Sequence, residues 1–303
     1  MARFRYASRT WRNEGTPEIT IMHAKLKGDW RKPTNTAAHQ KGGIHDDDTA
    51  TNLGFRGGTV AGSIHMEQFM PLLEATFGED CWQTGTLSLY FRSATVDQEP
   101  VRCFISEPVT TGILQRAAVW MEKEDGTLVM SGTASCGGHD EESELRRKIT
   151  TIRPVTEIRI LSSLQVDDTT SPQPARIANS SINEQLQVIT EPLDCYAKAD
   201  RFGGRVLPMT RIVAIFAGAE NALVKSIKPP FVGLYGAIEI EFIAGPVFSE
   251  TDYMASGTIV GLSDSPQTEI LWRDMLLAKG DKPIARMLKM DRLMKDSSPL
   301  WKA

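Results

Sequence analysis

The sequence is poor in cysteine, and its few cysteines form no recognisable framework. The four of them, Cys81, Cys103, Cys136 and Cys195, are scattered without the spacing of a disulfide scaffold. Cys136 and His139 are spaced like half of a metal site, but no second pair accompanies them, so we expect no metal. A reduced, cytoplasmic setting fits this cysteine usage best.

Long apolar runs and an excess of positive charge are also missing. No stretch approaches the roughly 20 apolar residues that a membrane span needs, so we expect no membrane partner. The basic residues at the start precede no apolar core, so we expect no secretory signal. With 34 basic and 38 acidic residues the net charge is −4, which gives no electrostatic reason to expect nucleic acid.

What remains is the composition of a soluble globular chain with room for two domains. Hydrophobic residues make up 41% of the 303 positions and charged residues 24%. Aligning Phe55 with Phe202, each beside paired glycines, gives an internal offset of 202 − 55 = 147 residues. A helical pattern and then alternating strands, at 87–91 and 238–242, follow each anchor. Each half is therefore expected to pair a helix with a mostly antiparallel sheet.

Smaller signals predict the remaining elements. Asp125 and Gly126 are typical of a tight hairpin. Pro71 should kink or split the helix of the first half. The polar run 140–148 is interpreted as the linker between the halves. Beyond residues 281–283, apolar side chains at helical spacing predict a closing C-terminal helix: Ile284, Met287, Leu288 and Met294.

A titratable cluster opens the segment around which the chain is organised. His45 is followed directly by Asp46, Asp47 and Asp48, and then by a turn rich in glycine. A histidine titrates near neutrality, and beside carboxylates it could carry out acid–base chemistry. The alternative is structural, because aspartates at this place also cap a following short helix.

Further candidates follow in the same segment. Backbone N–H groups near Gly62 and Ser63 begin a helix and could hold a negatively charged oxygen, or they could belong to a plain capped glycine turn. His65 in the first helical turn is either a second acid–base group or a hydrogen-bonded, half-buried histidine. Arg56 could meet a phosphate, although a solvated surface charge is the simpler interpretation.

The stretch HDDDTATNLGFRGGTVAGSIH, with the apolar helix after it and the later LSLYFR and EPVR segments, resembles the hot-dog proteins of the MaoC-like hydratase and thioesterase superfamily. The resemblance covers most of the first half and reaches the second only through the duplication. It implies an α+β double hot dog: two tandem units, 1–150 and 151–303, each a long central helix wrapped by a mostly antiparallel sheet. It further implies an acyl-thioester substrate, linked to coenzyme A or to a carrier protein, and we expect no cofactor.

The same resemblance assigns roles to the candidate residues. In the family's Asp-x-Asn-Pro-x-His motif, His45 falls on the histidine and would be the acid–base group of a hydratase or dehydratase. Asp47 would orient it, with Asp46 as the second choice, and an oxyanion hole would lie near Gly62 and Ser63. His65 and Arg56 are the further substrate-binding candidates.

The motif is not intact, because Gln40, Gly42 and Gly43 stand where the family has aspartate, asparagine and proline. Two alternatives therefore stay open: thioester hydrolysis by carboxylate-activated water, and a non-catalytic acyl-binding module. All five histidines lie in the first half, and Pro192 occupies the place equivalent to His45. We expect one active site in each chain, with the second unit as a tunnel wall, and by analogy a homodimer of chains.

Overall fold

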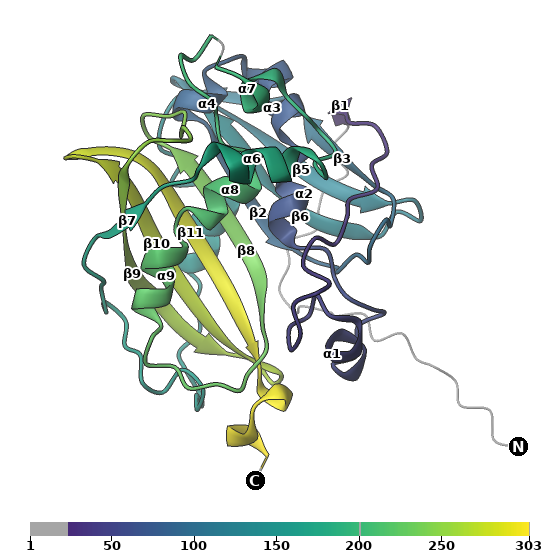
Figure 1. The fold of residues 1–303 in the computed structure, drawn as a ribbon, viewed down its shortest axis with the longest axis vertical. Helices are drawn as coiled ribbons and strands as arrows, with labels where there is room; N and C mark the ends of the chain where they lie inside the picture. Colours follow the sequence, from purple (N-terminus) through teal and green to yellow (C-terminus); the bar gives the residue numbers. More distant parts are fainter. Residues whose placement is uncertain (1–23, 200, 303) are drawn as a thin grey trace, which may run out of the picture.

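One continuous sheet runs through the molecule, which a computed structural model describes for residues 24–199 and 201–302 (Figure 1). The strand order is β1-β3-β5-β6-β2-β8-β11-β10-β9-β7, with β4 paired to β5, and every pairing is antiparallel. Among the described residues, no helix is long and apolar enough to cross a membrane. The strands are β1 (Ala24–Lys27), β2 (Thr86–Phe91), β3 (Val101–Ser106), β4 (Val109–Thr111), β5 (Leu114–Lys123), β6 (Leu128–Cys136), β7 (Gln173–Ala175), β8 (Gly233–Phe242), β9 (Tyr253–Asp264), β10 (Thr268–Lys279) and β11 (Lys282–Met294).

The internal duplication is present in the structure with the spacing read from the sequence. Helix α7 starts 194 − 47 = 147 residues after α1, and α8 starts 209 − 62 = 147 residues after α2. The same offset separates α9 from α3 (217 − 70) and β8 from β2 (233 − 86). The helices are α1 (Asp47–Asn52), α2 (Gly62–Glu67), α3 (Met70–Phe77), α4 (Cys81–Thr84), α5 (Glu144–Ile149), α6 (Asn179–Leu186), α7 (Asp194–Ala197), α8 (Met209–Ala214) and α9 (Ala217–Leu223).

The two halves are joined where β2 of the first pairs with β8 of the second. Thr86 lies opposite Glu241 and Tyr90 opposite Ala237, so the ladder passes from one half to the other without a gap. On the inner face of the sheet, α2 contacts α8, so the helices also meet across the seam. Met66, Phe69 and Met209 are among the buried residues of the shared core. The halves therefore share one hydrophobic core.

The long central helix expected in each unit is wrong, because each is split into two short helices. In the first half α2 ends at Glu67 and α3 begins at Met70, with Pro71 in its first turn. Proline has no N–H to donate to the carbonyl four residues earlier, here that of Glu67, so the helix cannot continue unbroken. The predicted kink is thus confirmed. The second half breaks at Ile215 and Phe216 without a proline.

The predicted C-terminal helix is also wrong, since that segment is strand β11 in the middle of the second half of the sheet. It pairs with β10 on one side and β8 on the other. A central strand is covered on both faces, so neighbouring residues such as Met287 and Leu288 are both buried. A continuous apolar run of this kind matches helical spacing as well as it matches a strand, which explains the error.

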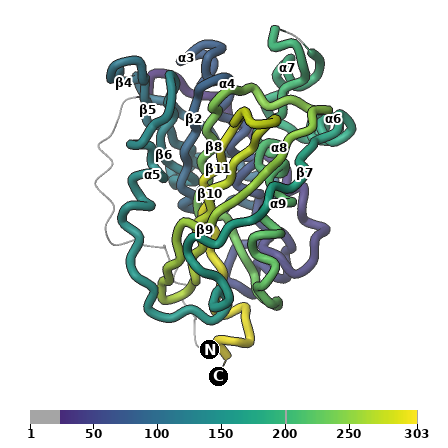
Figure 2. The backbone as a smooth tube through the Cα atoms, turned by 90° about the vertical axis from the view of Figure 1, so that its left-hand side faces the viewer, coloured from purple at the N-terminus to yellow at the C-terminus, as the bar shows by residue number. Residues whose placement is uncertain are grey.

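The predicted linker is a packed element that carries α5. In Figure 2 the strands stand between α5 on one side and α6, α8 and α9 on the other. Leu145 is fully buried against Tyr90 and its neighbours on the outer face of the seam. The Arg146 Nε donates to Glu239 Oε1 at 3.0 Å, which ties α5 to β8. Within α5, Lys148 pairs with Glu144 at 3.4 Å, one helical turn away.

Candidate functional site

His45 lies in the loop before α1, and its ring is fixed by a backbone group. Its Nδ1 lies 2.7 Å from the carbonyl oxygen of Thr59. A carbonyl can only accept, so Nδ1 carries the proton and Nε2 carries the lone pair of the neutral ring. Within the described part of the chain, Nε2 makes no hydrogen bond. The Nε2 of this half-buried imidazole is therefore not occupied by any residue that the structure describes.

The loop that carries His45 is held against the segment that leads into α2. The Thr59 N–H donates to Ile44 O at 2.8 Å, and the Asn35 Nδ2 donates to His45 O at 2.8 Å. A Cβ at Gly58 would lie 2.3 Å from His45 O, so only glycine permits this approach. This geometry places His45 directly beside the glycine turn. Gly62 lies three positions after Thr59 in the chain, so their Cα atoms are about 11 Å apart at most.

Two of the three aspartates after His45, Asp46 and Asp47, accept hydrogen bonds from the backbone. Asp46 caps α1: its carboxylate accepts from the Thr49 hydroxyl at 2.6 Å and from Lys41 Nζ at 2.6 Å. The Lys41 hydrogen bond and those from Thr49 lower the pKa of Asp46 to about 2, so it stays ionised. Asp47 is exposed, and its Oδ1 accepts from the Gly58 N–H at 2.6 Å. The group that orients the His45 ring is thus the Thr59 carbonyl, and Asp48 lies exposed beside Lys41.

The start of α2 offers backbone donors. Among the described residues, neither the Gly62 N–H nor the Ser63 N–H meets an acceptor, as expected for the first positions of a helix. A Cβ at Gly62 would lie 2.3 Å from the Phe91 ring, so glycine lets the helix start pack directly on β2. Ser63 is buried in the same turn. An oxyanion site at this turn, as predicted from the sequence, would use these two amides.

His65 and Arg56 are occupied by the protein itself. His65 is only 3% exposed, and its Nε2 lies 2.7 Å from Thr95 Oγ1. Burial lowers the pKa of His65 to about 4, so the ring is neutral at physiological pH and cannot serve there as an acid. Arg56 is bound to Glu99, which also pairs with Lys123 at 3.3 Å. His65 is hydrogen-bonded as its structural alternative expected, but it is fully rather than half buried, and Arg56 is a surface charge held in an ion pair.

Sequence reasoning missed a buried carboxyl group in the same helix. Glu67 is 1% exposed at the contact between α2 and α8. Its Oε1 accepts from the Thr210 N–H at 3.2 Å and its Oε2 from the Gln185 Nε2 at 3.1 Å. Burial raises its pKa to about 7 in spite of these hydrogen bonds. The sequence does not reveal this burial, because a single glutamate among apolar residues of a helix is normally expected on the exposed face.

Replacing Glu67 with glutamine is expected to stabilise the protein above neutral pH. Between the ordinary pKa of 4.5 and the folded value of about 7, the folded state holds a proton that the unfolded state releases. Stability therefore falls as the pH rises through this window and levels off above it. The shift corresponds to roughly 3 kcal/mol as an upper limit.

The measurement is urea unfolding from pH 4.5 to 8. We expect Glu67→Gln to gain about 1–3 kcal/mol at pH 8 and to flatten the profile, since glutamine still offers an oxygen to Thr210. The exposed Glu124, changed to glutamine, is the matched control and should leave the profile in place. Parallel profiles for wild type and Glu67→Gln would contradict the assignment.

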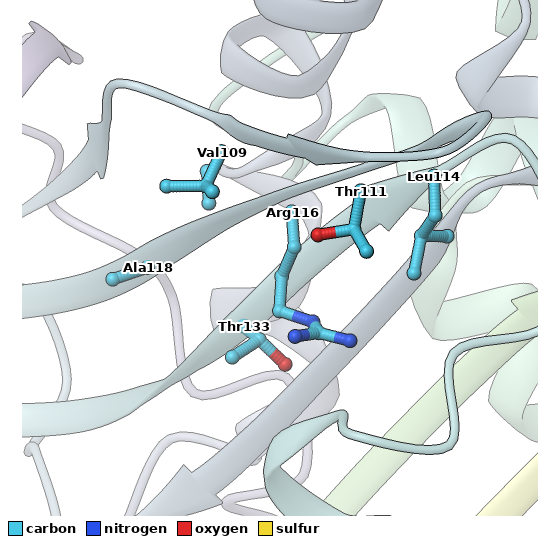
Figure 3. Close-up of a pocket in the computed structure, with 7 residues that line it drawn as sticks. Val109, Thr111, Leu114, Arg116, Ala118 and Thr133 are labelled. Atoms are coloured by element: carbon cyan, nitrogen blue, oxygen red, sulfur yellow. The ribbon is translucent and has the colours of Figure 1, made fainter.

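A separate hollow of about 280 Å³ lies on the outer face of the first half (Figure 3). Arg116, the charged residue of its lining, forms a bidentate ion pair with Asp140, with Nε 2.7 Å from Oδ2. None of the residues predicted from the sequence to form the site lines it. The lining includes Val109, Thr111, Leu114, Arg116, Ala118 and Thr133.

Comparison with known proteins places this fold. No family model matches the chain, and no curated protein matches it in sequence. A protein from Chloroflexus aurantiacus described as a MaoC domain dehydratase matches with a TM-score of 0.61 and 10% identity, over 90% of this chain and 95% of that one. A Mycobacterium tuberculosis protein with a double hotdog fold matches with a TM-score of 0.59 and 9% identity, over 90% and 97%. A Lactobacillus plantarum protein described as an oleoyl thioesterase reaches 0.50 and 10%, over 89% and 97%.

These likenesses define the class of the protein by its fold. The chain is an α+β double hot dog, with the architecture of MaoC-like dehydratases, as the resemblance in its sequence implied. Dehydratases and thioesterases both occur among the structural neighbours. At identities of 9–12% the shared property is the fold, so the chemistry has to be argued from this chain's own residues.

Proposed function

We propose that the protein is a hydratase or dehydratase of acyl thioesters, probed most simply as coenzyme A esters, with His45 as the acid–base group. The observation that carries the proposal is the His45 imidazole, whose Nδ1 is bonded to Thr59 O and whose Nε2 makes no hydrogen bond among the described residues. The unpaired amides at Gly62 and Ser63 begin the helix that follows Thr59, and they would receive the thioester oxygen.

The proton balance needs only one acid–base group. In the hydration direction Nε2 takes a proton from water as the water oxygen bonds to the β-carbon of an enoyl thioester, which leaves an enolate. The imidazolium then returns that proton to the α-carbon, and the carbonyl re-forms. Dehydration is the reverse. This scheme suits a site in which Gln40, exposed in a turn, stands in place of the family's carboxylate.

The second half supports the proposal by what it lacks. With the 147-residue offset, Pro192 corresponds to His45 and Ile212 corresponds to His65. Ile212 is fully buried. The second half therefore has no acid–base side chain at either place, and we infer one site in each chain. In the proposal, the second half completes the hydrophobic core and forms one wall of the substrate path.

The test is an assay of straight-chain trans-2-enoyl coenzyme A esters of increasing chain length. We expect the absorbance of the conjugated double bond to fall without release of free thiol, until hydration reaches equilibrium. Free thiol would instead show hydrolysis, and the carboxylate-based alternative would replace the proposal. Saturable binding without any turnover would show an acyl-binding module.

A further inference from the structure

In the second half of the chain, the outer face of the sheet is covered by the segment that leads to strand β7. Trp272, on the outer face of β10, is only 4% exposed. It belongs to a cluster with Leu145 of α5, and Ile149 and Ile152 pack against that cluster. On β9, Gly261 lies opposite Trp272, and a Cβ there would lie 2.5 Å from the Ile152 Cδ1. The chain from α5 to Ile152 therefore lies directly on the sheet.

The first half has a tryptophan at the matching place, but its outer face is hollowed and partly exposed. Trp120 lies on β5, the middle strand of the first half of the sheet, as Trp272 lies on β10 in the second. Its ring stacks on that of Phe104 with 5.2 Å between the centroids, and both residues stay partly exposed. Side chains alternate along a strand, so Trp120 shares its face with Ala118, which lines the hollow in Figure 3. We call this surface the Trp120 face; it is formed by Phe104, Val109, Arg116, Ala118, Trp120 and Thr133.

The internal duplication identifies the segment that stands in the corresponding place before the first half. Strands β1 and β7 are the two ends of the sheet, and the start of β7 corresponds to position 173 − 147 = 26, within β1. By the same offset, residues 149–164 correspond to residues 2–17, since 149 − 147 = 2 and 164 − 147 = 17. Residues 1–23 precede β1 directly and lie outside the described residues. The chain therefore has a segment of similar length where the second half has its cover.

The composition of residues 2–17 suits the Trp120 face. They include three aromatic side chains, Phe4, Tyr6 and Trp11, which can fill a hollow beside stacked rings. They also include four arginines and one glutamate, which give a net charge of 4 − 1 = +3.

The border of the Trp120 face carries the opposite charge. Among the described residues, the cations Arg116 and Lys123 are paired with Asp140 and Glu99. Arg102 remains as a cation over the ring of Trp30. Against it stand four carboxylates for which no ion pair is found in the described part of the chain: Glu122, Glu124, Glu141 and Glu142. A basic segment is therefore the complementary occupant.

We propose that residues 2–17 of the same chain pack on the Trp120 face, with their aromatic side chains in the hollow and beside the Trp120 and Phe104 rings. This contact is the counterpart of the cover that residues 149–164 provide in the second half. Because the segment and the face belong to one chain, the contact forms at any protein concentration. The inference does not depend on the proposed function, because no substrate takes part in it.

The test places a nitroxide spin label in this segment and follows the indole N–H signals of the six tryptophans by NMR of the full, ¹⁵N-tryptophan-labelled chain. All four native cysteines are buried, so the label reaches a cysteine introduced by Ser8→Cys. We expect the label to broaden the Trp120 signal beyond detection. The Trp272 signal should be affected far less, because β10 lies five strands from β5, about 24 Å away. Loss of one signal in Trp120→Phe identifies the Trp120 resonance.

A second label position is the matched control. Ser162 is exposed in the described cover of the second half. Arg159, three residues earlier, lies over the Trp301 ring at 4.4 Å. A label at Ser162→Cys should therefore broaden the Trp301 signal and leave that of Trp120 sharp. Equal broadening of Trp120 from both label positions would mean unspecific contact and would overturn the proposal.

Mixtures of two chains decide which copy supplies the segment. When chains that carry both ¹⁵N and the nitroxide at Ser8→Cys are diluted into an excess of unlabelled wild type, the broadening of Trp120 should persist. In the reverse mixture, nitroxide chains without ¹⁵N are added to ¹⁵N wild type, and its Trp120 signal should stay sharp. Broadening in the reverse mixture alone would show that a second copy covers the face, which overturns the proposal. A sharp Trp120 signal in both mixtures also overturns it.

Substitutions within the segment test the contacts. Phe4→Ser, Tyr6→Ser and Trp11→Ser, combined in the Ser8→Cys chain, remove the apolar side chains and should restore the Trp120 signal. Thr10→Ser combined with Thr16→Ser changes polar positions of the same segment and should leave the broadening unchanged. Thermal unfolding of each variant checks that the fold is intact. Broadening of Trp120 that survives the triple substitution contradicts the proposed packing.

Discussion

Replacing His45 with alanine is expected to lower the turnover of an enoyl thioester about 100- to 10,000-fold while leaving the fold in place. In the proposed reaction the imidazole both takes the proton from water and returns it, so its loss would remove both steps. The substitution breaks only the hydrogen bond to Thr59 O, which is worth about 1 kcal/mol. Initial rates and thermal unfolding, measured on the same preparation, give the two readouts.

Two controls separate loss of chemistry from loss of structure. His39 lies exposed in the same loop, so His39→Ala makes the same change away from the site and should keep its activity. Added imidazole should restore part of the His45→Ala turnover, because the vacated space can admit a free base. Residual activity above about one tenth of wild type, with no response to imidazole, would remove His45 from the chemistry.

The fold was largely readable from the sequence because the chain carries its own internal comparison. A 147-residue offset proposed from Phe55 and Phe202 recurs at the starts of α7, α8, α9 and β8. The errors arise where local spacing does not show which faces an element buries or where a helix breaks. Strand β11 is covered on both sides, so its apolar run was taken for a helix. No proline marks the helix break at Ile215 in the sequence.

The candidate site was readable only in part. Sequence order placed His45 beside the glycine turn, and Asp46 matches the capping alternative. The partner of the imidazole is the backbone carbonyl of Thr59. Every residue has such a carbonyl, so the residue type does not reveal this contact. Glu67 and Gln68, at the end of α2, are polar side chains that are nearly fully buried. In the sequence they look like the polar face of an amphipathic helix. Only the packing of the second half against the first reveals them.

That packing centres on an aromatic residue of the first half. Trp82 in α4 is fully buried, and its ring contacts three aromatic rings of the second half. The centroid distances are 5.9 Å to Tyr196, 6.1 Å to Phe202 and 6.4 Å to Phe242. Its Nε1 also donates to Glu74 Oε2 at 3.1 Å, which satisfies the one polar atom of the indole.

Trp82→Ala is therefore expected to destabilise the whole chain by about 3–5 kcal/mol, through lost burial and the cavity left behind. Trp82→Phe should cost less, about 1–2 kcal/mol, because a ring still fills much of the space. Urea unfolding followed by circular dichroism provides the measurement, with Trp30→Ala, whose tryptophan is 38% exposed, as the control expected to cost under about 1 kcal/mol.

Because β2 and β8 form one ladder, the weakened Trp82→Ala protein should still unfold in a single transition that includes both halves. Separate transitions would mean that the halves fold independently and that the seam contributes little to stability. An equal cost for Trp82→Ala and Trp30→Ala would contradict the central position assigned to Trp82. The aromatic contact joins the half that contains His45 to the half that has no equivalent histidine. We therefore expect the turnover of Trp82→Ala to fall in proportion to the fraction of protein that is unfolded.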